Sequence, residues 1–103
     1  MKFKNKSIVV PWDPDTMKGL KKVDELHTIF FGREAILTSG AEGYPGDGVH
    51  MQNSLHYKGM AFDVRISEAG DGLDFLNKVR KALPAEFQIL PFNVHFELDR
   101  KNK

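Results

Sequence analysis

The chain has 103 residues, a formal net charge of +1 and no cysteine. This length predicts one domain over residues 1–103, with a single modest hydrophobic core and no room for a second module. The near-neutral charge gives no electrostatic reason to expect a nucleic-acid partner, and no disulfide framework can hold the fold.

The first predicted elements are an extended segment and a long helix. Residues 7–10 suit either a short strand or an extended arm. A helix is predicted over residues 14–31, where apolar residues recur at helical spacing. Asp13 suits its N-terminal cap, Pro14 its first turn, and Gly32 its C-terminal cap.

The middle of the chain predicts a strand, a long loop, a second strand and a second helix. Residues 35–38 form a short apolar strand, and the glycine-rich residues 39–53 are too long for a plain connector, so we expect them to line a cleft. A strand follows from Lys58 onward. The second helix is capped by Asp71 and stopped by Pro84. Its predicted apolar positions are Leu73, Leu76, Val79 and Leu83.

Two more strands are predicted near the C-terminus, over residues 87–90 and 94–98, as a hairpin or a bent pair around Pro91. The elements together predict an α+β fold, in which two helices pack on one face of a small, mainly antiparallel sheet.

Alternation of side chains along two of these strands predicts a metal site. The apolar positions are Met60, Phe62, Val64 and Ile66 in one strand and Val94, Phe96 and Leu98 in the other. If the strands are neighbours, Asp63 and His95 share the opposite, polar surface. His56 lies seven residues before Asp63. Two imidazoles and one carboxylate, with a fourth position left to water, are the ligand set of a catalytic zinc. Gly59 and Ala61 would leave room for a substrate beside this metal.

The motif in this region resembles that of a known family. It reads S-x-H-x-x-G-x-A-x-D from Ser54 to Asp63, preceded by T-S-G at 38–40 and followed by V-H-F-E at 94–97. These motifs resemble the zinc DD-peptidase superfamily, which includes D-alanyl-D-alanine carboxypeptidases, phage L-alanyl-D-glutamate endopeptidases and the hedgehog signalling domain. The small phage-type members are the most similar.

The resemblance implies the superfamily's fold, a zinc cofactor and a peptidoglycan peptide as substrate. It implies His56, Asp63 and His95 as the zinc ligands, and Ser54 as a polar contact to the substrate.

One departure from the family pattern affects the chemistry. Peptidases of this superfamily usually carry an acidic residue three positions before the last histidine, where it moves protons, but this chain has Phe92 there. Glu97 is the first replacement, because strand alternation places it on the same face as His95. Glu42 and Asp47, in the long loop, are further candidates for the catalytic carboxylate.

Other polar residues have both functional and structural interpretations. His50 either lines the cleft and contacts substrate or is solvated. Arg65 either holds a substrate carboxylate or pairs with Asp63. His27, in the first helix, is predicted to be a structural histidine.

Two functions therefore remain open. The first is a zinc metallopeptidase that cuts stem peptides of peptidoglycan. The second, favoured by Phe92, is a non-catalytic domain that keeps the zinc and binds a wall peptide or a protein partner. The N-terminal segment lacks the apolar run of a signal peptide, and nothing in the sequence reaches the length of a membrane span. We therefore expect synthesis in the cytoplasm, which suits a phage product released to the wall by lysis.

Overall fold

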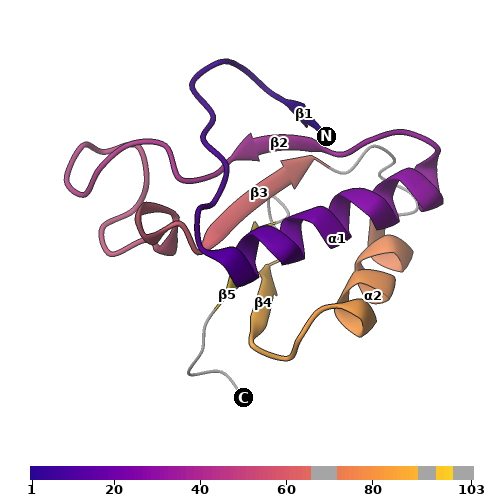
Figure 1. Ribbon diagram of the computed structural model, residues 1–103. Coiled ribbons are helices and arrows are strands. Elements are labelled where there is room, and N and C mark those ends of the chain that lie inside the picture. Colours follow the sequence, from indigo (N-terminus) through magenta and orange to yellow (C-terminus); the bar gives the residue numbers. More distant parts are fainter. Residues whose placement is uncertain (66–71, 91–94, 99–103) are drawn as a thin grey trace.

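A computed structural model describes residues 1–65, 72–90 and 95–98 (Figure 1). The elements in chain order are β1 (Lys2–Phe3), α1 (Pro14–Phe31), β2 (Ile36–Ser39), the 3-10 helix η1 (Leu55–Lys58), β3 (Ala61–Arg65), α2 (Gly72–Ala82), β4 (Phe87–Leu90) and β5 (His95–Leu98). These elements form an α+β fold with one five-stranded mixed sheet and two α-helices.

The strand order in the sheet is β1-β2-β3-β5-β4. The β1–β2 pair is parallel and the other three pairs are antiparallel, so the sheet is mainly antiparallel as predicted. The first strand is Lys2–Phe3, and residues 7–10 form an extended arm instead of a strand. The arm is held through Val9, whose carbonyl accepts a hydrogen bond from the Ala41 amide at 2.7 Å and whose amide donates one to the Glu42 carboxylate at 3.1 Å.

The first helix has the limits that its end signals predicted. The Asp13 carboxylate accepts a hydrogen bond from the Thr16 amide at 3.0 Å, and Pro14 occupies the first turn. Gly32 ends the helix with φ of 75°, a left-handed conformation that glycine adopts without steric cost. The buried face of α1 consists of Thr16, Gly19, Leu20, Val23 and His27.

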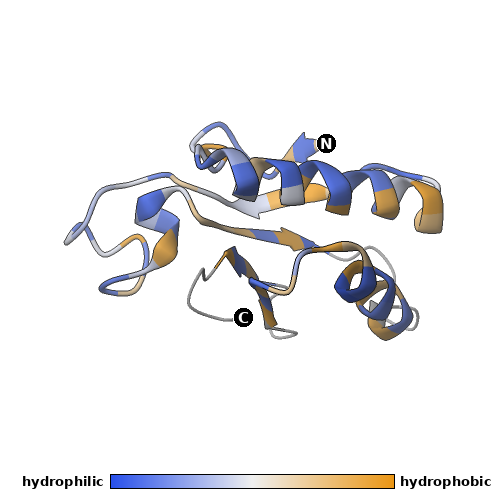
Figure 2. Cartoon of the chain, turned by 60° about the horizontal axis from the view of Figure 1, so that its bottom comes forward, coloured by the Kyte–Doolittle hydropathy of each residue, from blue (hydrophilic) through white to orange (hydrophobic). Residues whose placement is uncertain are grey.

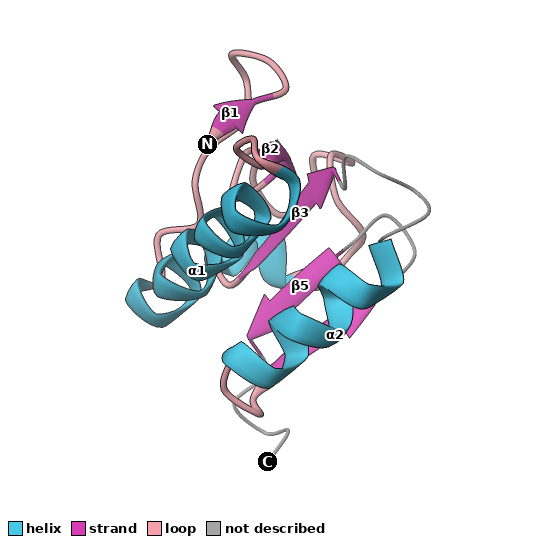
Figure 3. Cartoon of the chain, turned by 90° about the vertical axis from the view of Figure 1, so that its right-hand side faces the viewer, coloured by secondary structure: helices cyan, strands magenta, loops and turns pink. Residues whose placement is uncertain are grey.

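Both α-helices cover the same face of the sheet (Figures 1 and 3). Leu20 and Val23 of α1 join Phe75 and Val79 of α2 in one buried cluster with apolar residues of the strands. The strand members are Leu37, Phe62, Val64, Phe87, Phe96 and Leu98. Figure 2 shows hydrophobic and hydrophilic residues alternating along the central strands, as expected for a sheet with one apolar face.

The buried stripe of α2 differs from the prediction at one position. Leu76, Val79 and Leu83 are buried, but Leu73 is 66% exposed and Phe75 takes its place in the core. At about 100° per residue, Phe75 and the three buried aliphatic residues fall within one arc of about 100°, and Leu73 lies outside it. The predicted cap Asp71 lies outside the described residues.

The pairing of β3 with β5 confirms the predicted arrangement of polar and apolar side chains. Asp63 lies opposite His95, and Phe62 lies opposite Phe96. The two phenylalanines are fully buried and stack with their ring centroids 4.9 Å apart. Alternation then puts Asp63 and His95 on the other face of the sheet. Of the residues predicted for the apolar face, Ile66 and Val94 lie outside the described part of the chain.

The segment before β3 is not the strand that the sequence predicted from Lys58. Residues 55–58 form the 3-10 helix η1, which Gly59 ends with φ of 69°. A β-carbon on Gly59 would come within 2.4 Å of the Trp12 ring, so this glycine makes room for an aromatic side chain instead of a substrate.

Candidate metal centre

His56 is fixed by η1 and by the end of β2. The Ser54 hydroxyl caps η1 by accepting a hydrogen bond from the His56 amide at 3.1 Å. The imidazole is 5% exposed, and its Nδ1 lies 2.7 Å from the carbonyl oxygen of Gly40. A carbonyl can only accept, so Nδ1 carries a hydrogen, and Nε2 is the nitrogen left to coordinate an ion. A histidine held in this way has the tautomer and orientation of a metal ligand.

The lone pair of His56 is close to the side chains of Asp63 and His95. His56 Nε2 lies 3.3 Å from His95 Nδ1 and 3.5 Å from Asp63 Oδ1. His95 Nδ1 and Asp63 Oδ1 are 2.5 Å apart. The three side chains offer ligand atoms that all lie within 4.8 Å of one another, so this group could hold a metal ion. The structure thus brings together the three residues that the sequence predicted as ligands.

The spacing of these atoms fits a tetrahedral ion. Two nitrogen or oxygen ligands at about 2.0–2.1 Å from a tetrahedral zinc are separated by about 3.3–3.4 Å. The two distances from His56 Nε2, 3.3 and 3.5 Å, are close to this value. The Asp63–His95 separation is shorter, because these two groups contact each other directly, and they would have to part to share an ion.

The charges of Asp63 and His95 stabilise each other. Burial alone would raise the pKa of Asp63, but hydrogen bonds and positive charge from His56 and His95 outweigh it and lower the pKa to about 2. Burial alone would lower the pKa of His95, yet its hydrogen bonds to Asp63 and Glu97 and their negative charges raise it. The site therefore favours a carboxylate at Asp63 and attracts positive charge.

Glu97 contacts the far side of the His95 ring. Its Oε1 lies 2.9 Å from His95 Nε2, while Asp63 faces Nδ1 of the same ring. This arrangement is that of a carboxylate that orients a metal-bound histidine. Strand alternation predicted Glu97 at the site as a proton carrier. It did not predict the orienting contact with His95, which the structure adds.

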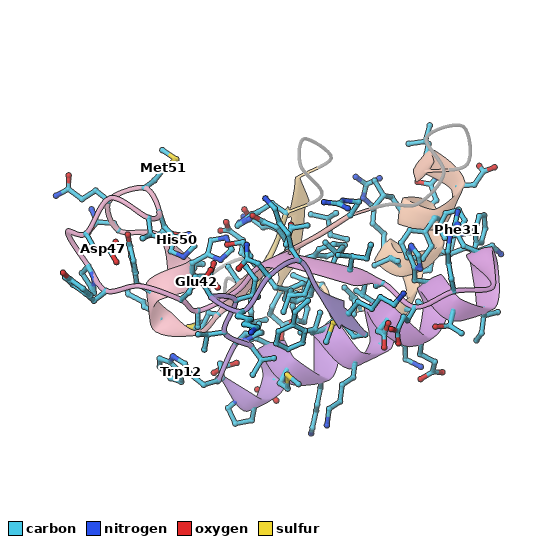
Figure 4. The ribbon with its side chains drawn as sticks, turned by 90° about the horizontal axis from the view of Figure 1, so that it is seen from above. Trp12, Phe31, Glu42, Asp47, His50 and Met51 are labelled. Carbon is cyan, nitrogen blue, oxygen red and sulfur yellow. The ribbon has the colours of Figure 1, made fainter. Side chains whose placement is uncertain are left out.

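A cleft of about 570 Å³ opens beside these residues. It is lined by the loop residues 49–55 and by His56, Asp63, His95 and Glu97. Figure 4 shows Met51 projecting outward from the loop, while His50 and Glu42 lie nearer the sheet. Met51 is 84% exposed. The long loop is therefore a wall of the cleft, as its length predicted.

The residues predicted to contact substrate have different positions. Ser54 and His50 both line the cleft. Ser54 also caps η1, and the ring of His50 stacks on the ring of His56. Arg65 is not among the described residues that line the cleft; it is exposed in β3 opposite Ile36. A substrate contact by any of the three stays a prediction.

The two loop carboxylates are engaged in local hydrogen bonds. Glu42 accepts from the Ser39 hydroxyl at 2.6 Å, from the Gly40 amide at 2.9 Å and from the Val9 amide at 3.1 Å. Burial raises the pKa of Glu42, but these hydrogen bonds outweigh it, so the net shift is downward. Such a group is a weak base, so Glu42 is poorly suited to take a proton.

Asp47 is held in the same manner and is not among the described residues that line the cleft. It accepts hydrogen bonds from the Tyr57 hydroxyl and the Tyr44 amide, both at 2.7 Å. The hydrogen bond from Tyr57 is the main cause that lowers the pKa of Asp47. Phe92, which occupies the family's usual acidic position, lies outside the described residues.

Three supporting residues were not predicted from the sequence. The Gly40 carbonyl orients His56, the Thr38 hydroxyl donates to the Asp63 carbonyl at 3.2 Å, and Tyr57 ties down the loop. The T-S-G motif contained the signal for the first two. His27 is fully buried and donates from Nδ1 to the Arg33 carbonyl at 2.7 Å, which confirms its structural role.

Comparisons of the chain with protein families, curated proteins and solved structures found no match. In the part of the chain that the structure describes, no helix combines the length and the apolar character needed to span a membrane.

Proposed function

We propose that this protein is a zinc-dependent peptidase of the DD-peptidase type that cuts stem peptides of peptidoglycan. One observation carries the proposal. In the wall of a cleft, His56 Nε2 lies 3.3 Å from His95 Nδ1 and 3.5 Å from Asp63 Oδ1, which are close to the separations between two ligands of a tetrahedral zinc. The sequence motif around these residues supports the peptidase class and the substrate.

The donor set suits zinc, because imidazole nitrogens and a carboxylate oxygen are its usual ligands. Bound zinc would polarise a peptide carbonyl and lower the pKa of a water molecule toward neutrality. His56 and His95 would hold the ion with neutral nitrogens, and Asp63 would supply one negative charge. Ser54 and the loop residues 51–53 would position the peptide along the cleft.

Glu97 is the proposed carrier of the proton that passes from water to the leaving amine. Apart from the ligand Asp63, it is the one carboxylate among the described residues lining the cleft. Its side chain is 23% exposed, so it is accessible from the cleft. One of its oxygens already contacts His95, so Glu97 would combine orientation of a ligand with proton transfer.

The test of this proposal has a metal arm and an activity arm. The purified protein should bind about one zinc per chain, and replacing His56, Asp63 or His95 with alanine should weaken binding sharply. The zinc-loaded protein should release new amino termini from purified peptidoglycan, and their identity would show which bond is cut. A protein that binds no zinc, and whose melting temperature zinc does not raise, would refute the proposal.

A second function is a wall-binding domain that keeps the zinc but does not cut. Phe92 at the usual acidic position favours it, and so does the contact that engages Glu97 with His95. In that case the zinc-loaded protein would sediment with purified peptidoglycan and release no amino termini from any peptidoglycan type. Phe92→Glu, which restores an acid at this position, would then test directly whether the missing acid is the reason that no amino termini are released.

A further inference from the structure

The ring of His50 lies flat on the ring of the proposed ligand His56. Their centroids are 4.3 Å apart and their planes differ by 4°. The side chain of His50 is 8% exposed, so solvent reaches little of it. Nearly parallel rings at this centroid separation are in offset van der Waals contact.

This face is the part of His56 that its hydrogen bond leaves unrestrained. The backbone of η1 fixes one end of the side chain, and the Gly40 carbonyl fixes Nδ1 at 2.7 Å. These restraints leave the imidazole free to tilt about the line that joins them. A flat side chain packed on one face opposes that tilt, and Nε2 then stays aimed at Asp63 and His95.

His50 is itself held on both its side chain and its backbone. Its Nε2 donates to the Glu42 carbonyl at 2.9 Å. Its backbone amide donates to the Tyr57 hydroxyl oxygen at 2.8 Å, and that hydroxyl donates to Asp47 at 2.7 Å. The Tyr57 ring also meets the His50 ring edge-on, with centroids 4.9 Å apart. Tyr57 directly follows His56, so this latch ties the loop back to the helix that carries the ligand.

We propose that His50 is a positioning residue that fixes the plane of the His56 imidazole, and that the Asp47–Tyr57 hydrogen bond latches His50 in place. The proposal rests on the proposed metal site and assigns His50 a role other than substrate contact. Its Nε2 is already bonded to the Glu42 carbonyl and is therefore engaged within the protein.

The test compares two replacements of His50 that differ in shape. His50→Phe keeps a flat ring but loses the Nε2 donor, whereas His50→Leu removes the flat ring. Zinc affinity would be measured by competition with a chromophoric chelator, and ligand geometry by the visible spectrum of the cobalt-substituted protein. We expect His50→Leu to bind zinc about 10–100-fold more weakly and to alter the cobalt spectrum. His50→Phe should remain close to the parent in both.

Two tyrosine variants test the latch, one at Tyr57 and a control at Tyr44. Tyr57→Phe removes the hydroxyl that joins Asp47 to His50, and Tyr44→Phe removes a hydroxyl from a side chain that is 70% exposed. Tyr57→Phe should weaken zinc binding in the same direction as His50→Leu, and Tyr44→Phe should have no effect. The effects of Tyr57→Phe and His50→Leu should be less than additive, because both act through one contact.

The outcomes separate this proposal from the proposed function. Parent-like zinc affinity and cobalt spectrum in His50→Leu would overturn the positioning role and leave the metal site intact. An equal loss in His50→Phe would overturn the role of the flat ring. A parent protein that binds neither zinc nor cobalt would overturn both proposals. Circular dichroism of the metal-free variants checks that they fold. If His50→Leu does not fold, His50→Gln replaces it, because glutamine has no flat ring but keeps a donor for the Glu42 carbonyl. Parent-like zinc affinity and cobalt spectrum in His50→Gln would then overturn the positioning role.

Discussion

At the scale of single residues, the carboxylates near the cleft differ in chemistry because they differ in partners. Glu42 accepts hydrogen bonds from a hydroxyl and two backbone amides. Glu97 instead faces the ring of a proposed ligand at 2.9 Å. A carboxylate bonded to backbone donors stabilises a loop, whereas one beside an imidazole in a cleft is positioned to orient the ligand and to exchange protons.

Two variants of Glu97 separate orientation from proton transfer. Glu97→Gln keeps an oxygen for His95 Nε2 but cannot act as a base, so it should hold zinc and lower turnover about 100-fold or more. Glu97→Ala removes both functions and should also weaken zinc binding about 10–100-fold. Parallel zinc titrations and peptidoglycan digestion check this. Near-normal turnover in Glu97→Gln would mean that Glu97 only orients His95. Glu42 and Asp47 would then be the remaining candidates for the catalytic carboxylate.

The pH dependence of Glu42 follows from the direction of its pKa. Its folded-state pKa lies below the ordinary value of 4.5, so its ionised form contributes stability above about pH 4.5, and this contribution is lost as pH falls through the lowered pKa. Glu42→Gln should lower the free energy of unfolding by about 1–3 kcal/mol at pH 7. In urea unfolding, the difference between parent and variant should shrink as the pH falls below 4.5; a difference that stays constant with pH would contradict the assignment.

At the scale of elements, the N-terminal arm packs closely against Gly40, which directly follows β2. A β-carbon on Gly40 would lie 1.9 Å from the Val9 carbonyl oxygen, so the two backbones are too close for any side chain between them. The Gly40 carbonyl in turn holds His56. The arm therefore packs against the residue that orients the proposed ligand His56.

A pair of glycine variants tests this close approach. Gly40→Ala must push the arm away, so it should destabilise the fold by several kcal/mol, with loss of zinc affinity because the Gly40 carbonyl moves. In Gly32→Ala the added β-carbon contacts nothing, so only the left-handed backbone at φ of 75° is unfavourable for alanine. The free energy of unfolding should fall by about 1–2 kcal/mol, and zinc binding should be unchanged. Thermal unfolding and zinc titration of both variants check the contrast. Equal losses of stability would mean that Gly40 is not restricted by the arm.

At the scale of the whole molecule, the sheet separates the core from the candidate metal centre. The two helices and the apolar strand residues lie on one face, and Asp63 and His95 lie on the other. Burial of the apolar face stabilises the strands whose polar face carries these two proposed ligands. A loss of core packing should therefore reach the site only through global unfolding.

Two leucines of α2 test where the core ends. Leu76 is 5% exposed, so Leu76→Ala should lower the free energy of unfolding by about 2–5 kcal/mol. Leu73 is 66% exposed, so the same change there should cost about 0.5 kcal/mol or less. Chemical denaturation of the two variants gives the comparison. A large loss in Leu73→Ala would support the core position that the sequence first predicted.

The sequence by itself determined the features that depend on local chemistry. Asp13, Pro14 and Gly32 set the limits of α1, because capping and left-handed backbone are properties of one or two residues. Alternation in β3 and β5 determined that Asp63 and His95 share a face, because a strand repeats every two residues. The third proposed ligand, His56, was predicted from the motif, in which it lies seven residues before Asp63.

Only the tertiary structure decided the features that join distant segments. Neither the pairing of Lys2–Phe3 with β2 nor the contact of Val9 with Gly40 has a local signal. Two contacts depend on side-chain directions, which the repeat of a strand or helix does not fix. They are the stacking of His50 on His56 and the contact of Glu97 with His95 Nε2. Sequence patterns identify which face a residue occupies, but the atoms that meet there are set by how the loop, the arm and the sheet pack together.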